Sequence, residues 1–522
     1  MKTRTLLAAV ATMLAAAPAV WAAPANYMIS NEPPYRNQGG YGTCWTFATM
    51  ASIETNIIQE ALPGYDAAAG LSERDLAWDS GFLDQLGGGL TGINNGGDYL
   101  MAAAYLARGG GPLTDAQAPY SGMNTAPPSG QTSPYYVRDI EWYHTVADIK
   151  TAVMQYGAVA TCWQTSSSTQ EYTWSSTLNN YVYYDPGPGI SNPPPGYNNQ
   201  PNHGVAIIGW DDTVQCPTGG GTGAWIIRNS WGDSTQHFGV SYNDFYTGND
   251  TPDTDAFCLG AVSFHNVVPN TYQKIYYYNE FGWTAQQPHA YAMNHFTATQ
   301  TALLKSVSFY TTGDSVNYTV KVYEQFQNGL LGKLATTVSG SEAFEGFHTI
   351  DLSSLVPLAQ GQDFYVELQT SNGWQANDGN VSRQRLLDFQ SATGTADTTA
   401  LPGQSYFSDG GLTWTDLQTV DTSANFAIDG LTVPLVYGDA TQDGKVNIDD
   451  FSILLAHWGD SSASWTDGDF TGDGVVNIDD FSVLLANWGT SSGSDFAAVQ
   501  TPEPTTLVLL GLGGLALLRR RK

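Results

Sequence analysis

Residues 38–47 read QGGYGTCWTF, and the residues that follow them carry a helical pattern. A glycine-rich loop leads to Cys44, and apolar side chains then recur at helical spacing as far as Ile58. A cysteine at the N-terminus of a helix lies at the positive end of the helix dipole, which lowers its pKa and favours the thiolate. Taken alone, a cysteine before an amphipathic helix is more often structural, so the prediction of a reactive thiol depends on the rest of the chain.

Two later segments place a histidine and an asparagine beside buried strands. Residues 202–210 read NHGVAIIGW, with His203 at the head of an apolar run. Residues 224–232 read AWIIRNSWG, with Asn229 just after another apolar run. Continuous apolar runs of this length predict buried strands. Cysteine, histidine and asparagine in these three settings suggest the nucleophile, base and orienting group of thiol catalysis.

The three segments resemble the active-site motifs of the papain-like cysteine peptidases. The resemblance covers roughly residues 30–260 and extends to NGG at 95–97, to PY at 119–120 and to the run from 149 to 159. It implies an α+β papain-like domain over residues 23–265. It also implies a secreted cysteine endopeptidase that hydrolyses protein or peptide substrates through an acyl-enzyme, with no cofactor for catalysis.

The resemblance assigns a role to each candidate catalytic residue. Cys44 attacks the peptide carbonyl as a thiolate, and His203 acts as its base and then protonates the leaving amine. Asn229 accepts a hydrogen bond from the other ring nitrogen of His203 and orients it. The side-chain amide of Gln38 and the backbone N–H of Cys44 donate to the oxyanion.

Two further residues have supporting roles in this resemblance. Trp231 covers the hydrogen bond between histidine and asparagine, and Gly97 exposes backbone that pairs with an extended substrate. Two other functions stay open: a non-catalytic binding or adhesion protein on the same fold, and a thiol acyltransferase (transpeptidase) that passes the acyl group to an amine. Retention of all four catalytic residues favours an enzyme, and only product analysis separates hydrolysis from acyl transfer.

The cysteines depart from the family pattern. Family members commonly carry a pair of cysteines at the positions of Tyr41 and Asn94, so one disulfide is absent here, with an expected cost in stability. Cys162 lies in an apolar stretch and is expected to be a buried small hydrophobe. If Cys44 is the nucleophile, at most one bridge forms among the others, and Cys216 with Cys258 is the preferred pair.

The overall charge limits the partners of the chain. The 522 residues suffice for about three domains. Lysine and arginine number 19 against 49 aspartate and glutamate residues, which gives a formal net charge of -30. Such a chain repels polyanions, so no nucleic-acid partner is expected.

Both ends of the chain carry targeting signals. Residues 1–22 combine basic Lys2 and Arg4 with an apolar run and a small-residue cleavage site, which predicts a signal peptide and export. Residues 491–522 contain a Ser/Gly-rich linker, TPEP at 501–504, a short apolar run and a basic end. This tail resembles the PEP-CTERM sorting signal read by an exosortase. It implies a secreted or cell-envelope protein with a transient C-terminal membrane segment; a permanent weak anchor is the alternative.

Residues 266–436 carry the pattern of an all-β sandwich. Short alternating strands such as YTVKVY at 318–323 are separated by turn signals such as NG at 328–329. The segment resembles the lectin-like β domain found behind some bacterial papain-like peptidases. Trp283, Trp374 and Trp414 suggest carbohydrate as a partner, although core positions are favoured for these side chains.

Residues 437–490 contain a duplicated acidic loop. GDATQDGKVNIDD at 438–450 recurs as GDFTGDGVVNIDD at 468–480, and each copy leads into an apolar helix. Oxygen ligands fall at positions one, three, five, seven, nine and twelve with glycine at six, which is the spacing that calcium requires. The predicted ligands are Asp439, Thr441, Asp443, the Lys445 carbonyl, Asn447 and Asp450, then Asp469, Thr471, Asp473, the Val475 carbonyl, Asn477 and Asp480.

The loop pair resembles a dockerin, which implies a small all-α module that holds calcium and docks on a cohesin-type partner. Threonine at position three departs from the usual asparagine or aspartate and is expected to weaken calcium binding. A calcium-stabilised structural cap without a partner is the alternative. The expected chain is therefore multidomain: an α+β papain-like domain, an all-β sandwich and a dockerin-like pair of loops.

Overall fold

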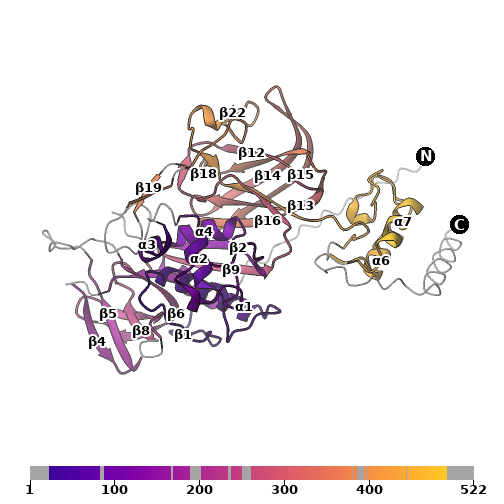
Figure 1. The fold of residues 1–522 in the computed structure, drawn as a ribbon. Coiled ribbons are helices and arrows are strands. Elements are labelled where there is room, and N and C mark those ends of the chain that lie inside the picture. The colour runs from indigo at the N-terminus through magenta and orange to yellow at the C-terminus, as the bar shows by residue number, and fades with distance from the viewer. Residues whose placement is uncertain are drawn as a thin grey trace, which may run out of the picture.

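The computed structural model describes residues 23–82, 88–165, 169–187, 201–232, 237–249, 260–379, 381–384, 393–396, 398–441 and 444–490. The predicted signal peptide, the linker and sorting tail, Cys258 and the predicted ligand Asp443 lie outside these residues. Figure 1 shows three regions in chain order: indigo to magenta elements with most of the helices, orange strands, and two yellow helices at one end.

The first region is an α+β domain, as predicted. Its helices come early in the chain, and most of its strands follow them. The elements are β1 (Asn26–Met28), α1 (Cys44–Gln59), α2 (Glu73–Asp79), α3 (Gly89–Asn94), α4 (Tyr99–Ala107), β2 (Tyr135–Tyr143), α5 (Val146–Tyr156), β3 (Val159–Trp163), β4 (Glu171–Ser175), β5 (Asn180–Tyr184), β6 (His203–Gln215), β7 (Thr222–Arg228), β8 (His237–Ser241) and β9 (Ala261–Pro269).

Helix α1 is the centre of this domain. It is buried from Cys44 to Ile57, so its residues pack on every side instead of forming one apolar stripe. It lies against β3, β6 and β9, which are neighbours in the sheet order β2-β9-β3-β6-β7-β8. The helix therefore carries Cys44 directly to the strand that begins at His203.

The second region is β-rich, as predicted. Its strands are β10 (Lys274–Tyr276), β11 (Ala285–Gln287), β12 (Tyr291–Thr297), β13 (Ala302–Thr311), β14 (Val316–Gln327), β15 (Leu330–Glu342), β16 (Gly346–Leu358), β17 (Asp363–Thr370), β18 (Gln375–Asp378), β19 (Val381–Gln384), β20 (Thr393–Ala396), β21 (Ser405–Ser408), β22 (Thr415–Asp416), β23 (Asn425–Phe426) and β24 (Ile428–Pro434). The predicted turn at Asn328 and Gly329 joins β14 to β15, and both residues have positive φ, as a tight hairpin requires.

Two sheets of this β domain share one apolar core. Strands β13, β16 and β24 supply Phe309, Val356 and Ile428, and β14 and β17 of the second sheet supply Val320 and Phe364. Burial of one apolar face from each sheet accounts for the alternating pattern in the sequence. Trp283 packs toward Trp142 of the α+β domain, as favoured, whereas Trp374 is 41% exposed, contrary to the core position favoured for it.

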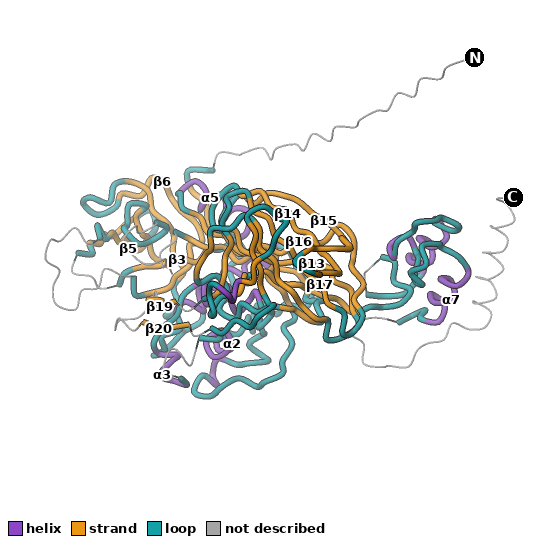
Figure 2. The backbone as a smooth tube through the Cα atoms, turned by 90° about the horizontal axis from the view of Figure 1, so that it is seen from above, coloured by secondary structure: helices purple, strands orange, loops and turns teal. Residues whose placement is uncertain are grey.

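A continuous sheet joins the two regions. Strand β16 pairs antiparallel with β2, with Gly346 opposite Glu141 and His348 opposite Asp139. One 13-stranded sheet consequently runs from β10 to β4, and Figure 2 shows strands through the middle of the molecule. Buried Tyr310 and Phe347 of the β domain also belong to the core cluster that contains α4. The boundary expected between residues 265 and 266 falls inside strand β9.

The third region contains α6 (Ile448–Ala456) and α7 (Ile478–Ala486), packed around Val446, Leu454, Val476 and Leu484. Each helix begins with a capping box, in which Asn447 or Asn477 precedes the helix and Asp450 or Asp480 accepts from the asparagine backbone N–H.

The suggested Cys216–Cys258 bridge is wrong. Cys216 is a free thiol whose Sγ lies 3.3 Å from the Gly223 carbonyl oxygen, inside the turn between β6 and β7. Cys162 is buried in β3, as predicted for a small apolar side chain.

Candidate active site

Cys44 is the first residue of α1 and is only 4% exposed. The chain reaches it through Gly42, where a side chain is excluded because a Cβ would lie 2.7 Å from the carbonyl oxygen of Asn94. The glycine-rich loop thus lets the backbone pass close to α3 and places the thiol at the positive end of the helix.

His203 and Asn229 meet because β6 and β7 are antiparallel neighbours. His203 begins β6, and Asn229 follows the end of β7. His203 Nε2 lies 2.8 Å from Asn229 Oδ1, as predicted for this pair. The same oxygen accepts from the Ser230 backbone N–H at 2.8 Å, so it acts as an acceptor and Nε2 must be the donor. Nδ1 is then the ring nitrogen left to exchange a proton.

Two indoles border this histidine. The Trp231 ring stacks on the His203 ring with centroids 4.7 Å apart, and the Trp163 ring meets it edge-on at 6.2 Å. Trp231 is 39% exposed, whereas His203 and Asn229 are buried. The indole therefore covers one face of the buried His203 ring. Its role in shielding the histidine–asparagine hydrogen bond from water stays a prediction.

The side-chain amide of Gln38 is oriented by a residue to which the sequence assigned no role. Ser230 Oγ donates to Gln38 Oε1 at 2.6 Å, and Gln38 Nε2 donates to the Tyr41 carbonyl at 2.9 Å. An amide nitrogen carries two protons, so one stays available to the site. Ser230 was visible only as the residue after Asn229, and no spacing signal connects it with Gln38.

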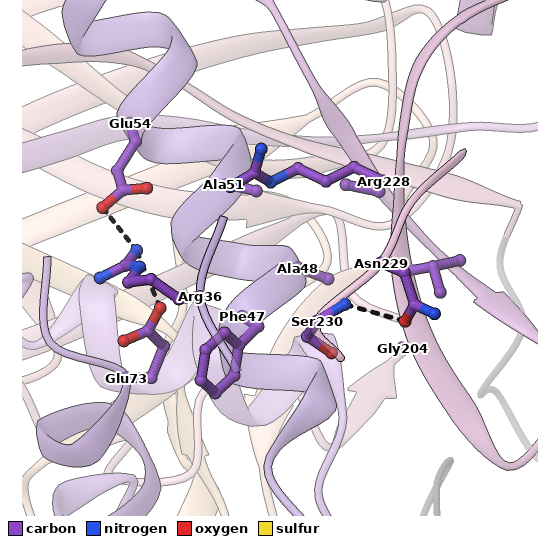
Figure 3. Close-up of a pocket in the computed structure, with 12 residues that line it drawn as sticks. Arg36, Phe47, Ala48, Ala51, Glu54, Glu73, Gly204, Arg228, Asn229 and Ser230 are labelled. Carbon is purple, nitrogen blue, oxygen red and sulfur yellow. Dashed lines mark hydrogen bonds and ion pairs between the residues drawn. The ribbon is translucent and has the colours of Figure 1, made fainter. Parts of the chain in front are cut away.

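Ion pairs hold the loops that carry these groups. Arg36, two residues before Gln38, lies 2.6 Å from Glu54 of α1 and 2.8 Å from Glu73 of α2. Arg228, next to Asn229, lies 2.5 Å from Glu32. Figure 3 shows Arg36 between its two glutamates, in a pocket that also meets Asn229 and Ser230. Burial raises the pKa of Glu73, and the Arg36 guanidinium opposes that rise.

Burial shifts both members of the Cys–His pair toward neutrality. Desolvation raises the pKa of the Cys44 thiol, while backbone hydrogen bonds at Gly204 and Trp45 and the Gln38 side chain lower it. Desolvation lowers the pKa of His203 to about 4, and the hydrogen bond to Asn229 raises it. Each pKa shift reflects the free-energy cost of placing one isolated charge in a buried site. Transfer of the proton from the Cys44 sulfur to the His203 imidazole creates two opposite charges, and their attraction offsets that cost.

Gly97 and Gly204 both lie against Trp45. A Cβ on Gly97 would come within 2.4 Å of the indole ring, and Gly97 is itself buried. A Cβ on Gly204 would lie 2.9 Å from Trp45 Cα and 3.0 Å from its backbone nitrogen. The absence of side chains here lets the His203 strand touch the first turn of α1. The substrate-pairing role of Gly97 stays a prediction.

Gly204→Ala is expected to lower kcat/KM by about 10²-fold, because the added methyl group forces the His203 strand away from Cys44 and misplaces the reacting groups. Steady-state kinetics and thermal unfolding of the variant measure this effect. Gly40→Ala is the matched control, since its Cβ would meet nothing within 4 Å. Equal kcat/KM for the two variants would contradict the close approach.

The acidic loops bring several predicted oxygen ligands together. Thr441 Oγ1 lies 3.2 Å from Asp439 Oδ1 and 2.9 Å from Asp450 Oδ1. In the second loop Thr471 Oγ1 lies 3.3 Å from Asp469 Oδ1 and 3.0 Å from Asp480 Oδ1. The side-chain oxygens of Asn447 and Asn477 also cap α6 and α7, by accepting from the N–H groups of Asp449 and Asp479.

Family models match three segments of the chain. Residues 28–250 match the papain family cysteine protease model, residues 275–432 the lectin like domain, and residues 500–522 the PEP-CTERM protein-sorting motif. These matches confirm three of the four resemblances seen in the sequence. Within the residues that the structure describes, no helix is long and apolar enough to cross a membrane.

Similar proteins support the same division. Cathepsin L 2 and cathepsin L 1 of Paramecium tetraurelia are each 30% identical over 204 residues, which is 39% of this chain and 52% of each relative. The chain thus spans about half the length of the curated relatives it matches. Cysteine proteinase A of Leishmania mexicana is 27% identical over 205 residues, 38% of this chain and 49% of that protein.

A solved structure shares the two-domain fold. The cysteine protease and lectin-like domains of Cwp84, a surface layer associated protein of Clostridium difficile, align with a TM-score of 0.59 at 21% identity, over 79% of this chain and 89% of that one. The protease segment and the lectin-like segment of this chain thus resemble a pair of domains found together in a solved structure. The chain carries a papain family cysteine protease domain, followed by a lectin like domain and a PEP-CTERM protein-sorting motif.

Proposed function

We propose that the protein is a cysteine endopeptidase that uses Cys44 as nucleophile and His203 as base. The hydrogen bond of 2.8 Å from His203 Nε2 to Asn229 is the observation that carries this proposal, because it leaves Nδ1 as the proton carrier. The oriented amide of Gln38 adds a donor for the oxyanion.

The reaction follows from these positions. The Cys44 sulfur attacks the peptide carbonyl, and its proton passes to His203 Nδ1. The oxyanion accepts from Gln38 Nε2 and from the Cys44 backbone N–H. Collapse of the tetrahedral intermediate breaks the C–N bond, and His203 gives its proton to the departing amine. Water, deprotonated by His203, then hydrolyses the thioester and restores the thiol.

Peptidase activity of the exported chain on a broad peptide library, under reducing conditions and with an epoxide thiol-protease inhibitor as probe, tests the proposal. Cleavage together with labelling at Cys44 supports it. Labelling without cleavage, followed by transfer to an added amine, would favour an acyltransferase. A folded sample that neither cleaves nor becomes labelled would indicate a binding protein.

We also propose that residues 437–490 bind two calcium ions in a dockerin-like module. Asp450 and Asp480 are fully buried carboxylates, and each lies beside a threonine hydroxyl that also contacts the first aspartate of its loop. Oxygen donors of this kind fit calcium. The first ion would be held by Asp439, Thr441, Asp443, the Lys445 carbonyl, Asn447 and Asp450. The second ion would be held by the corresponding residues of the second loop. The docking role on a cohesin-type partner rests on the resemblance alone.

Removal of calcium is expected to lower the free energy of unfolding of this module by about 3 kcal/mol per site at a calcium concentration one hundred times the Kd. Calorimetry of the protein with calcium and with a chelator measures the change. Asp480→Asn should halve the stabilisation that calcium provides. Asp460→Asn, which lies outside both loops, should leave that stabilisation unchanged. An unfolding transition that is the same with calcium and with the chelator would contradict calcium binding.

The localisation follows from the sequence signals. We propose that residues 1–22 direct export and that an exosortase-type enzyme recognises the C-terminal motif, so the protease acts outside the cytoplasm or at the cell envelope. Trp374, exposed on the β domain, is the residue through which a carbohydrate would stack. Proteins or peptides are the expected substrates.

A further inference from the structure

Three potential metal ligands converge where the protease domain meets the β domain. Glu141 lies on β2, Glu342 ends β15, and His348 lies on β16. One ligand atom from each lies within 4.8 Å of the other two. The three residues come from both domains, and the pairing of β16 with β2 brings them together.

The side chains of this cluster are largely buried. His348 is 1% exposed and Glu141 is 8% exposed, while Glu342 is partly buried. The Glu141 carboxylate accepts one hydrogen bond of 2.8 Å, from the Tyr143 hydroxyl, and its Oε2 lies 3.7 Å from Nε2 of the buried His265. A buried carboxylate requires either a partner of opposite charge or a proton, since desolvation of an isolated charge is expensive.

The hydrogen bonds fix the tautomer of His348. Its Nε2 lies 3.0 Å from Thr311 Oγ1, and the Thr311 hydroxyl donates its only proton to the Phe344 carbonyl. Thr311 must therefore accept, so Nε2 carries the proton. In the neutral ring Nδ1 is then a bare lone pair.

That lone pair faces negative charge. His348 Nδ1 lies 3.8 Å from Glu342 Oε2 and 3.7 Å from Asp139 Oδ1, too far for a hydrogen bond, and it has no hydrogen-bond partner. Among the residues that the structure describes, no lysine or arginine forms an ion pair with Asp139, Glu141 or Glu342. A buried nitrogen lone pair between carboxylates is repulsive, so the ring either carries a second proton on Nδ1 or shares a metal cation with these carboxylates.

We infer that Glu141, Glu342 and His348 form a zinc-class divalent metal site at the seam between the two domains. One imidazole nitrogen and two carboxylates suit Zn²⁺, whereas Ca²⁺ prefers oxygen alone. Ligand atoms around tetrahedral zinc lie about 3.4 Å apart, so small side-chain movements close the present spacing. The Thr311 bond then serves as the outer contact that orients a metal-bound histidine.

Such an ion would tie β2 of the protease domain to β15 and β16 of the β domain. Metal binding at this site does not depend on peptidase activity, because none of the metal ligands belongs to the Cys44 site. The test uses the full chain with Cys44→Ala, so that the catalytic thiol cannot bind zinc, and with excess Ca²⁺ to fill the C-terminal loops. Zinc bound after equilibrium dialysis is then counted by mass spectrometry.

The expected result is one tightly bound Zn²⁺ per chain that is lost in His348→Gln and in Glu342→Gln. Each substitution should weaken binding by about 100-fold or more. His289→Gln is the matched control, since His289 also faces a carboxylate, that of Asp409 at 3.1 Å, but lies outside the cluster.

Glu342 is partly exposed, so Glu342→Gln keeps the test valid if His348→Gln fails to fold. Anomalous scattering at the zinc edge from crystals of the Cys44→Ala chain provides a second readout, with a peak expected between Glu141, Glu342 and His348. Zinc binding unchanged in folded Glu342→Gln, or a peak elsewhere only, would overturn the site.

Discussion

Replacing Cys44 by alanine is expected to lower kcat/KM by about 10⁶-fold, to the level set by the remaining binding groups. Without the sulfur no acyl-enzyme forms, and neither His203 nor Gln38 can supply a nucleophile in its place. Peptide cleavage under reducing conditions measures the loss, and labelling by the epoxide should disappear with it.

Cys216→Ala is the matched control for this experiment. Cys216 is also a free thiol, but it lies in the turn between β6 and β7, and burial raises its pKa. We expect full activity from this variant and labelling that stays at Cys44. Loss of cleavage in Cys216→Ala, or cleavage that survives in Cys44→Ala, would show that another residue is the nucleophile.

Gln38→Ala is expected to lower kcat by about 10²–10³-fold, the usual cost of one oxyanion donor. The amide is nearly buried, and Ser230 and Tyr41 fix its rotation, so the free N–H is already oriented before the substrate binds. Because the donor acts on the charge that develops in the transition state, KM should change little.

The control for Gln38→Ala is Gln117→Ala, which removes an amide that donates to the Thr132 carbonyl away from the site. The epoxide should still label Cys44 in both variants, since labelling needs the thiol and the histidine. A rise in KM with unchanged kcat in Gln38→Ala would instead indicate a role in substrate binding.

The shared sheet changes how the two folded domains are understood. The strand pairing between β16 and β2 adds backbone hydrogen bonds to an apolar contact that includes α4 and Phe347. Gly346 at this junction has a φ of 153°, and a Cβ there would lie 2.0 Å from the Ile140 carbonyl oxygen. The two domains consequently behave as one packed unit, and the β domain is not a tethered accessory.

Local sequence was sufficient for the elements and for the type of chemistry. Helix α1 begins at Cys44 because a glycine-rich loop stops there and a buried apolar pattern starts. The runs that end at Trp210 and Arg228 became β6 and β7, and alternating residues became β13, β14 and β17. These signals are short-range, since hydrophobic period, turn residues and caps act within a few positions of the chain.

Only the tertiary structure decided how distant residues act on one another. Ser230 orients Gln38 although the two residues lie 192 positions apart in the sequence. His348 lies near Glu141 because β16 pairs with β2, and neither strand's own sequence specifies that pairing. The edge of a strand carries the same backbone groups whichever neighbour it finds, so sequence pattern specifies a strand but not its partner. The same limit explains why the sequence cannot specify the partner of Cys216, which is a free thiol in the structure.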